Sequence, residues 1–530
     1  MKKITWTLYI LLFTILQNAQ TPEINWEEKY SVKGFGATVN QKPIGHTNDY
    51  FFIKCEDKEN QNLIQFDFED KEIKTTSLDF KFNGEEVVMY HIINTASGDY
   101  LLGRNRDTKL KKAYIHATSI STSGQIGKSL EHLFTHDYKR HKSWVSGDKK
   151  NQDLEGVKLS QDSTKVLFTN VTSNKDHRKK KYKDEYIINV FNDRLEKLWE
   201  KKLDSPLADN NMTILQYEIS NAGDVYILSK DKVREKQNKC RWCPLYDFTL
   251  TKVSNDGNVQ KVKIDLGEDY AKHTRIHIDK DGNILVLGYF TERKKRDVLR
   301  LEHGIFFNKY DSNGEILMQK RHRWEDDFYT KLEEEYNFQK ISRTSSDGFY
   351  INDVNVDYKR KSITLISEHL FQVVERRVTN TRGVDGRTGS NRRETSTQVS
   401  NYATYLIIPS LGFDGNLKWT SFIERESYNS SFRGNTISNS QDGYIYLIFD
   451  DKKTKEERSK EVVKNKFFDT FTDFVRINSE GEIDIRETIF NSQETGLYFD
   501  PHNSDCIGSE IILLFCRNRK SARHGLLKLP

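Results

Sequence analysis

The chain of 530 residues has only seven prolines, and it has no serine- and glycine-rich stretch of the kind that separates domains. Beyond its first residues it has no hydrophobic run approaching the ~20 residues that a membrane-spanning helix needs. Gly-x-Ser-x-Gly elbows, His-Glu-x-x-His helices and phosphate-cradling glycine loops are also missing. These absences argue against a string of domains, a membrane-embedded mature chain and the enzyme classes that such motifs define.

The first residues are predicted to be a secretory signal peptide. Two lysines (Lys2 and Lys3) precede an apolar run from Ile4 to Leu16, and the small residue Ala19 follows. This order is typical of an export signal. We expect cleavage after Ala19, which makes 1–19 the signal peptide and 20–530 the mature chain; an uncleaved anchor is the alternative. The protein is therefore expected in the periplasm, secreted, or peripheral to the outer membrane.

Polar turns carrying Gly or Asp-Gly recur along the chain between β-rich runs. The clearest is Asp281-Gly282-Asn283, between Ile278 and the strand 284–287. Asp-Gly and Asn-Gly between apolar runs favour hairpins, and two hairpins about every 60 residues match one propeller blade. We predict an all-β chain that forms a single β-propeller of seven four-stranded blades, closed by N- and C-terminal strands.

Two alternatives to this architecture remain open. The runs 50–55 and 63–68 would form a further blade if they pair with each other, which gives eight blades. A pair of β-sandwiches would also use many short strands separated by turns. Frequent aromatic residues, with 30 Phe and 25 Tyr, suit the pleated surfaces of either fold.

The segment Asp281–Thr291 resembles a repeat of exported bacterial β-propellers. That repeat has an Asp-x-x-Gly-Asn turn, a hydrophobic strand and a Gly-Tyr-Thr end; here Gly288 and Tyr289 are followed by Phe290 and Thr291. The turn Asp311-Ser312-Asn313-Gly314 is similar to its second hairpin. The good match covers one blade. The resemblance implies a fold and no activity, because propellers include both binding proteins and enzymes.

Positive charge is concentrated in the loops expected between the second and third strands of each blade. Their formal charges total +24 against a net +5 for the chain, which leaves −19 for the remainder. If these loops share one face, it is basic and would attract polyanions; ordinary solvated loops are the alternative. The residues predicted to form this basic rim are Lys179, Lys180, Lys181, Arg293, Lys294, Lys295, Arg376, Arg377, Arg392 and Arg393.

The longest insertion is expected at about 373–400, where six arginines lie among Gly, Thr and Ser. Guanidinium groups bind phosphate or carboxylate in a bidentate manner. The composition predicts a mobile loop that orders on contact with an anion. A loop with no such role is the alternative.

Five cysteines leave at least one unpaired if all pairing is within the chain. Cys240 and Cys243 have CxxC spacing in an expected hairpin loop, which favours a local disulfide in an oxidising compartment over free thiols, metal binding or redox chemistry. Cys55 lies in the N-terminal strands, whereas Cys506 and Cys516 lie in the last ones. A bridge between these two regions would seal the ring.

Signals for catalysis or metal binding are weak. His273, Arg275 and His277 alternate on one strand that should begin at the mouth of the channel, and Asp500 and His502 have a comparable place in the last unit. Polar residues that alternate on an innermost strand are also ordinary channel lining. The Asp279-x-Asp281-Gly282 pattern begins like a calcium loop, but Phe290 stands where such a loop needs Glu. We expect no metal or cofactor.

The sequence therefore predicts an exported, non-catalytic binding or scaffold protein that uses a basic, loop-rich face. Suitable partners are an acidic polysaccharide, anionic lipid head groups or a cell-envelope protein. Nucleic acid is disfavoured because the chain has a predicted export signal and no nucleic-acid reader motif. The alternatives are a hydrolase or lyase acting on saccharide or peptide at the channel, and a structural component of an envelope assembly.

Overall fold

The protein is described here by a computed structural model, whose described residues are almost entirely β-structure. These residues are 24–26, 30–31, 40–56, 61–68, 72–137, 156–176, 181–204, 212–232, 246–291, 302–328, 330, 348–382, 391–429, 436–452, 470–501, 504–508, 510–518 and 521–529. Within them, no helix is long and apolar enough to cross a bilayer.

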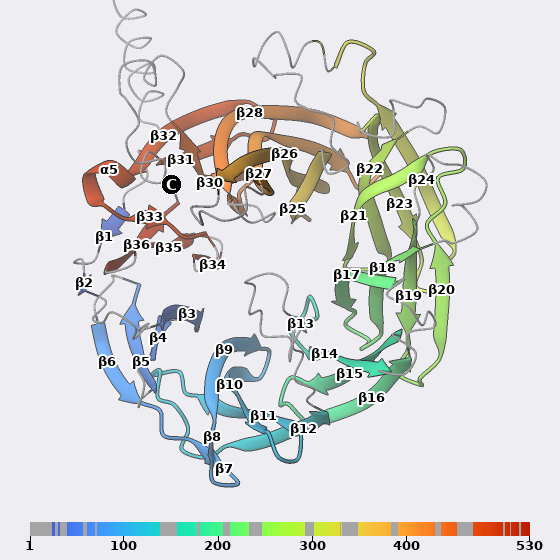
Figure 1. The fold of residues 1–530 in the computed structure, drawn as a ribbon. Helices are drawn as coiled ribbons and strands as arrows, with labels where there is room; N and C mark the ends of the chain where they lie inside the picture. The colour runs from blue at the N-terminus through green and yellow to red at the C-terminus, as the bar shows by residue number, and fades with distance from the viewer. Residues whose placement is uncertain are drawn as a thin grey trace, which may run out of the picture. The chain divides into compact units, whose positions relative to one another are not determined.

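The larger of two compact units comprises Ile44–Asn48 and Ser77–Gly434, and its described part holds five four-stranded antiparallel sheets (Figure 1). In each sheet, strands that follow one another in sequence lie side by side, which is the pattern of a propeller blade. The strands of the five sheets are β9 (Val88–Thr95), β10 (Gly98–Asp107), β11 (Lys112–Ile120), β12 (Glu131–Asp137); β13 (Gly156–Leu159), β14 (Lys165–Asp176), β15 (Lys181–Asn192), β16 (Lys197–Asp204); β17 (Met212–Ile219), β18 (Val225–Lys232), β19 (Tyr246–Val253), β20 (Val259–Lys263); β21 (Tyr270–Ile278), β22 (Ile284–Thr291), β23 (Gly304–Tyr310), β24 (Ile316–Arg323); β25 (Gly348–Asp357), β26 (Ser362–Arg382), β27 (Asn391–Gly412) and β28 (Leu417–Asn429).

The smaller unit comprises Met1–Pro43, Asp49–Thr76 and Asn435–Pro530. Its described part contributes three further blade sheets. Their strands are β3 (Asn40–His46), β4 (Tyr50–Glu56), β5 (Gln61–Asp67), β6 (Glu72–Ser77); β29 (Thr436–Gln441), β30 (Tyr444–Lys452), β31 (Thr470–Ile477), β32 (Ile483–Asn491); and β33 (Tyr498–Phe499), β34 (Asp505–Ile507), β35 (Ile511–Arg517) and β36 (Ser521–Lys528). A four-residue helix, α5 (Ser492–Thr495), precedes the last sheet.

The predicted β-propeller fold is confirmed, and the described residues form eight blade sheets, which is the alternative to seven that the sequence left open. The sequence-based number is one short because the runs 50–55 and 63–68, which lie in β4 and β5, pair with each other in a blade of their own. The predicted sharing of one sheet by N- and C-terminal strands is confirmed. β1 (Ile24–Trp26) and β2 (Tyr30–Ser31) both pair with β36, with Ile24 opposite Leu527.

The polar turns hold the hairpins through side-chain hydrogen bonds to the backbone. One carboxylate oxygen of Asp279 accepts the amides of Asp281 and Asn283 at 3.0 and 2.8 Å, and Gly282 between them has φ of 80°. The other oxygen of Asp279 lies 2.9 Å from Lys309 Nζ. The segment is thus a β-turn, as expected, and its carboxylate is already used within the fold. The same bonding recurs in the turns that begin at Asn192, Asp311 and Asn478.

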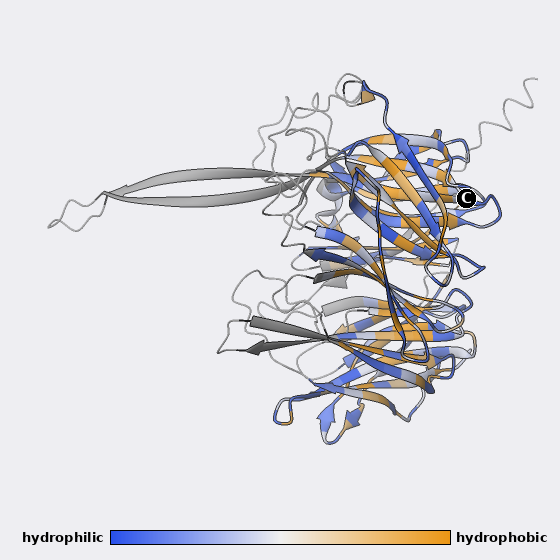
Figure 2. Cartoon of the chain, turned by 90° about the vertical axis from the view of Figure 1, so that its right-hand side faces the viewer, coloured by the Kyte–Doolittle hydropathy of each residue, from blue (hydrophilic) through white to orange (hydrophobic). Residues whose placement is uncertain are grey.

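The hydrophobic core lies between successive blades, because each blade buries both faces of its middle strands. All eight residues of β22 are buried. Ile284 and Val286 pack toward the β17–β20 blade, whereas Leu285 and Leu287 pack toward the β25–β28 blade. This division follows the two-residue period of a strand. Figure 2 shows hydrophobic residues along the strands and hydrophilic ones at many of the turns.

The insertion at 373–400 differs from the loop that we expected, because most of it is strand. β26 and β27 continue in antiparallel register from Val373 opposite Ser400 to Arg382 opposite Asn391. Thr, Val and Ser between the arginines suit a strand, and pairing satisfies the backbone groups that a loop would leave to water. The segment 383–390 lies outside the described residues.

One fully buried ion pair lies in the β25–β28 blade. Arg425 Nη1 is 2.7 Å from Glu368 Oε1, and their side chains are 0% and 1% exposed. Charges so far from water are tolerated only while they are paired.

We predict that Glu368→Gln lowers the free energy of unfolding by about 3–5 kcal/mol, because it leaves a buried guanidinium without its counter-charge. Chemical denaturation with an intrinsic fluorescence readout measures the change. Asp79→Asn is the matched control: Asp79 is 77% exposed and pairs with the exposed Lys81 at 3.2 Å, so its loss should cost less than about 1 kcal/mol. Equal effects of the two substitutions would contradict the prediction.

Candidate functional site

A β-bulge in the inner strand β21 positions two of the polar residues near its start. Ala271 pairs with Phe290 and Thr274 pairs with Gly288, so that Lys272 and His273 both face the single residue Tyr289. A bulge redirects side chains and twists the strand locally. The inner strands β9, β17 and β25 have register shifts as well. The bulge is therefore a recurrent device of the larger unit, and in β21 it carries charged and titratable groups.

Gly288 makes this bulge sterically possible. A Cβ atom at position 288 would collide with the backbone carbonyl of His273, and it would lie 2.9 Å from Thr274 Cα. The glycine of the Gly-Tyr pair is thus required by the close approach of β21. Gly288 thus has a structural role: it leaves room for the backbone of His273.

His273 packs into a charged environment between two blades. Its ring lies 4.2 Å from that of Tyr350, between centroids, and a Cβ atom at Gly348 would be 3.4 Å from its Nε2. The neighbouring Lys272 forms an ion pair of 3.0 Å with Glu302, whose side chain is 1% exposed. Glu302 also accepts the amide of Phe349 at 3.2 Å, which ties the β21–β24 blade to β25.

Burial and nearby cations keep His273 neutral. Burial, followed by the charges of Lys272, Lys230 and Arg275, lowers the pKa of His273 to about 3. His369, in β26 of the next blade, also has a pKa lowered to about 3, by burial and by Lys272. A histidine with so low a pKa is a weak general base near neutral pH.

Two further residues of this environment come from the β17–β20 blade. The ammonium of Lys230 lies 3.4 Å from the ring centroid of Tyr246, which is a cation–π contact. Burial lowers the pKa of Lys230. We use the name His273 cluster for the set of Lys230, Tyr246, Lys272, His273, Arg275, Glu302 and Tyr350.

The His273 cluster lies at the end of its blades where β18 and β22 finish, before 233–245 and 292–301, which lie outside the described residues. It combines three cationic side chains with one buried carboxylate, Glu302. Pairing with Lys272 uses that carboxylate, and the charge of Asp353 acts on Arg275, so Lys230 and Arg275 provide a positive potential that Asp353 partly offsets. Arg275 in addition donates to the carbonyl oxygen of Ile351 in the next inner strand.

The three residues predicted on β21 do not form one site. His277 lies about 13 Å along the strand from His273, at about 3.3 Å per residue. Its Nε2 is 2.9 Å from the hydroxyl of Tyr358. Burial lowers the pKa of His277 to about 4. The fourth candidate, His502, lies outside the described residues; its neighbour Asp500 is paired with Arg517 at 2.5 Å in the smaller unit.

The predicted basic rim lies largely beyond what the structure describes. Lys179, Lys180, Arg293, Lys294 and Lys295 fall outside the described residues. For the others only the backbone is described: Lys181 begins β15, and Arg376, Arg377, Arg392 and Arg393 are in β26 and β27. Sequence inspection did not single out Lys230, Tyr246, Glu302 or Tyr350 as site residues. A charged residue two positions before the buried strand 304–307 is a usable signal for Glu302.

The ring-sealing disulfide is wrong. Cys55, Cys506 and Cys516 form no disulfide bond with one another. Cys55 packs in a different apolar cluster from Cys506 and Cys516, and Cys506 Sγ instead lies 3.3 Å from the carbonyl oxygen of Ser438. Cys240 and Cys243 lie outside the described residues. In the described part, no three His, Cys, Asp or Glu side chains are grouped so as to hold a metal.

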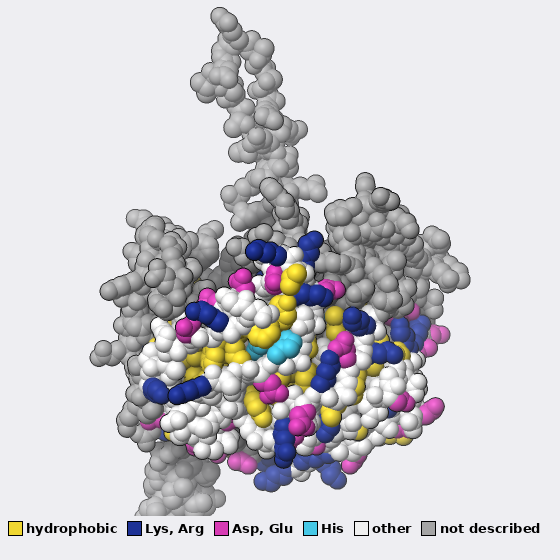
Figure 3. All heavy atoms as spheres, turned by 90° about the horizontal axis from the view of Figure 1, so that it is seen from below, with side chains coloured by type: hydrophobic (Ala, Val, Ile, Leu, Met, Phe, Trp, Pro, Cys, Tyr) yellow, Lys and Arg dark blue, Asp and Glu magenta, His cyan; other side chains and the backbone are white. Residues whose placement is uncertain are grey.

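Histidines also gather on the β9–β12 blade, beneath the small hairpin of β7 (Lys81–Phe82) and β8 (Glu85–Glu86). Phe82 lies 4.5 Å from the ring of His116 and 5.4 Å from that of His132. Figure 3 shows histidine beside hydrophobic side chains on one face of the molecule. Burial, with the charge of His132 adding to it, lowers the pKa of His116 to about 4. These rings act as packing groups that secure the hairpin.

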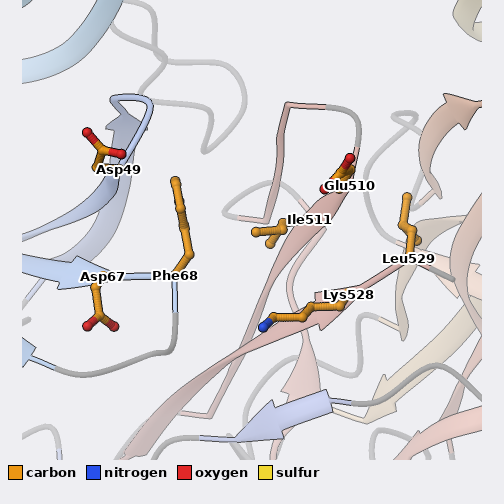
Figure 4. A pocket seen from close by; sticks show the side chains of 7 residues that line it. All are labelled: Asp49, Asp67, Phe68, Glu510, Ile511, Lys528 and Leu529. Carbon is orange, nitrogen blue, oxygen red and sulfur yellow. The ribbon is translucent and has the colours of Figure 1, made fainter.

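A cavity of about 490 Å³ lies in the smaller unit, between the β3–β6 and β33–β36 blades. Figure 4 shows Asp49, Asp67 and Phe68 on one side of it, and Glu510, Ile511 and Lys528 across the gap. The lining contains three carboxylates and one lysine. This cavity therefore lacks the cationic character of the His273 cluster.

Comparisons with known proteins do not assign the chain to a family. No family model and no curated protein matches it. Among solved structures, the β-propeller domain of the Trilobed protease from Pyrococcus furiosus is 9% identical with a TM-score of 0.35, covering 89% of this chain and 98% of that one. The WD40 domain of SCAP from fission yeast is 9% identical with a TM-score of 0.35, covering 95% and 98%. The polysaccharide lyase Uly1 is 9% identical with a TM-score of 0.34, covering 92% and 90%. Likenesses at this level carry no functional argument.

We predict that Gly288→Ala lowers the free energy of unfolding by roughly 1–3 kcal/mol, because the new methyl group meets backbone that cannot move without breaking the bulge. Urea denaturation measures the loss. Gly156→Ala is the control, since the nearest atom to its added Cβ is 3.6 Å away. A stability loss no greater than that of the control would refute the steric role of Gly288.

The low pKa of His273 predicts an acid-sensitive stability. An unfolded histidine binds its proton near pH 6.5, whereas folded His273 does so near pH 3. Between these values the unfolded state holds the additional proton, so stability falls as the pH falls. His273→Gln should flatten this dependence by up to about 1.4 kcal/mol per pH unit. Denaturation curves of both proteins from pH 8 to 4 test this. The stability difference at pH 8 gives the effect of the substitution that is unrelated to protonation. If stability depends on pH equally in the two proteins, the low pKa of His273 is contradicted.

Proposed function

We propose that the protein is an exported, non-catalytic β-propeller that binds an anionic polysaccharide through the loop-rich end of its blades. The observation that supports this most is the gathering of Lys230, Lys272 and Arg275 around the neutral His273. Lys272 is paired with Glu302, and the two remaining cations add to the field of the basic segments in the sequence. Export rests on the predicted signal peptide at 1–19.

The arginines of the long β26–β27 hairpin extend this proposal. Arg376, Arg377, Arg392 and Arg393 belong to strands that are paired in register, with Arg376 opposite Thr397 and Arg392 opposite Thr381. Paired strands restrict the backbone before a ligand arrives, and this lowers the ordering cost that a loop would impose. Carboxylate groups spaced along a polysaccharide would match several guanidinium groups at once.

The alternative of a hydrolase or lyase that uses His273 as its base gains no support from the surroundings of this residue. Its low pKa and the three cations near it oppose protonation. His277, the other histidine of β21, bonds to Tyr358 at some distance along the strand. A binding role requires neither group to exchange a proton.

We predict that the full mature chain binds polygalacturonate and that its affinity falls at least about tenfold between 50 and 200 mM salt, because exposed charges are screened. The quadruple variant R376Q/R377Q/R392Q/R393Q should bind at least about tenfold more weakly, and Lys230→Gln should bind a few-fold more weakly, as expected for lost charge pairs. Isothermal titration calorimetry measures both effects.

The matched control removes the same number of charges elsewhere in the larger unit. R194Q/K202Q/K261Q/K320Q replaces four exposed cations of turns and outer strands and should change the affinity less than about twofold if the effect is local. Binding that is absent or insensitive to salt would overturn the proposal. Equal losses in the two quadruple variants would do so as well, because they would indicate a response to net charge alone.

A further inference from the structure

A cavity of about 480 Å³ lies at the end of the blades opposite the His273 cluster. It is lined by the turns between the first and second strands of three successive blades, β13–β16, β17–β20 and β21–β24, and by Ser312 in the turn between β23 and β24. Its volume is in the range of small-molecule sites, which extends from about 300 to 1,000 Å³. Polar groups from each of the three blades reach it, among them Gln161, Glu218, Asn221, His277, Asp281 and Ser312.

The charges around this cavity are mostly compensated within the protein. Asp224 lies 3.0 Å from Lys252, and Asp279 lies 2.9 Å from Lys309. Glu218 has Lys158 at 3.7 Å and accepts the side-chain amide of Gln216 at 2.7 Å. Asp281 and Lys280 add one charge of each sign to the lining. A ligand therefore need not bring a counter-charge, which separates this cavity from the cationic cluster.

One wall is a neutral hydrogen-bonded chain that crosses between blades. The hydroxyl of Tyr358 lies 2.9 Å from His277 Nε2 and also bonds to the side chain of Gln161. His277 keeps no charge near neutral pH, since burial lowers its pKa to about 4. Lys280 covers the ring of Tyr358, with its ammonium 4.4 Å from the centroid. The wall thus presents fixed hydrogen-bonding groups, His277 and Gln161, beside one lysine that contacts an aromatic ring.

The remaining lining alternates hydrogen-bonding and apolar groups. The Asp281 carboxylate and the Ser312 hydroxyl have no hydrogen-bond partner among the described residues, and both line the cavity. Leu159, Ile219 and Ile278 supply apolar surface beside them. A pyranose ring is complementary to such a lining. Its hydroxyl groups need hydrogen-bond donors and acceptors, and its C–H faces need apolar contact.

We propose that this cavity is a second binding site, which takes a neutral hexose-sized saccharide unit. It is independent of the anion-binding function proposed above, because it uses other residues at the other end of the blades. A protein with both sites would hold a charged chain at one end and a neutral sugar at the other.

Saturation-transfer difference NMR on the full mature chain tests this site with D-glucose, D-galactose and D-mannose as probes. We expect at least one of them to bind in the millimolar range. Ala222→Trp should weaken that binding at least tenfold, because residue 222 is an exposed turn residue that lines the cavity. Ser123→Trp places the same side chain on an exposed turn of the β9–β12 blade and should leave binding unchanged.

Gln161→Ala and Asp281→Asn provide smaller changes, in case the tryptophan disturbs folding; each should weaken binding several-fold with an unchanged unfolding temperature. The proposal is overturned if none of the three hexoses binds, or if Ala222→Trp binds the hexose as well as Ser123→Trp does. A third outcome also overturns the proposal: D-galacturonate binds more tightly than D-galactose, and Lys230→Gln abolishes that binding. The sugar would then occupy the cationic cluster.

Discussion

The close approach of β21 to β22 at Gly288 is the constraint on which the candidate site depends. The bulge places Lys272 and His273 opposite one residue of the neighbouring strand, and only a glycine leaves room for it. Glu302 then holds Lys272 from the start of β23, and it also bonds to the backbone of β25. A steric requirement in one strand pair thus determines how charged groups of two blades meet the backbone and Tyr350 of a third.

Opposite ends of the same inner strand have different electrostatic characters. At the His273 end, cations exceed the single buried carboxylate, whereas at the His277 end Asp224, Asp279 and Glu218 each have a nearby lysine. Both histidines are neutral for the same physical reason, since burial disfavours the imidazolium. The two histidines therefore act as hydrogen-bonding and packing groups, and the ligands proposed for the two ends differ because the neighbouring side chains differ.

The sequence was sufficient for the blade architecture because hairpin turns depend on local chemistry. Asp279 and Asp311 bond to the backbone amides of their own turns, and the glycines adopt the positive φ that these turns require. The number of blades was harder to obtain because β4 and β5 lack such a turn signal. The shared terminal sheet was predictable from the short apolar runs at both ends of the chain.

The members of the His273 cluster were less accessible from the sequence. Lys230, Glu302 and Tyr350 are brought to His273 by contacts between blades, and no local pattern records such contacts. The cysteine bridge failed for a related reason: it required the strands of Cys55, Cys506 and Cys516 to share one blade, but Cys55 lies in the β3–β6 sheet and its side chain enters a separate apolar cluster. The insertion at 373–400 was misjudged because glycine and serine were given more weight than the intervening Thr and Val, which favour strands.

The pairing of β1 with β36 has a consequence for how the protein reaches its final form. Ile24 and Leu527 are neighbours in one sheet, yet about 500 residues separate them, a sequence separation that slows folding. During synthesis the early strand waits without its partner until Leu527 has been made. The sheet that joins the two strands therefore cannot close on a chain that stops short of that residue.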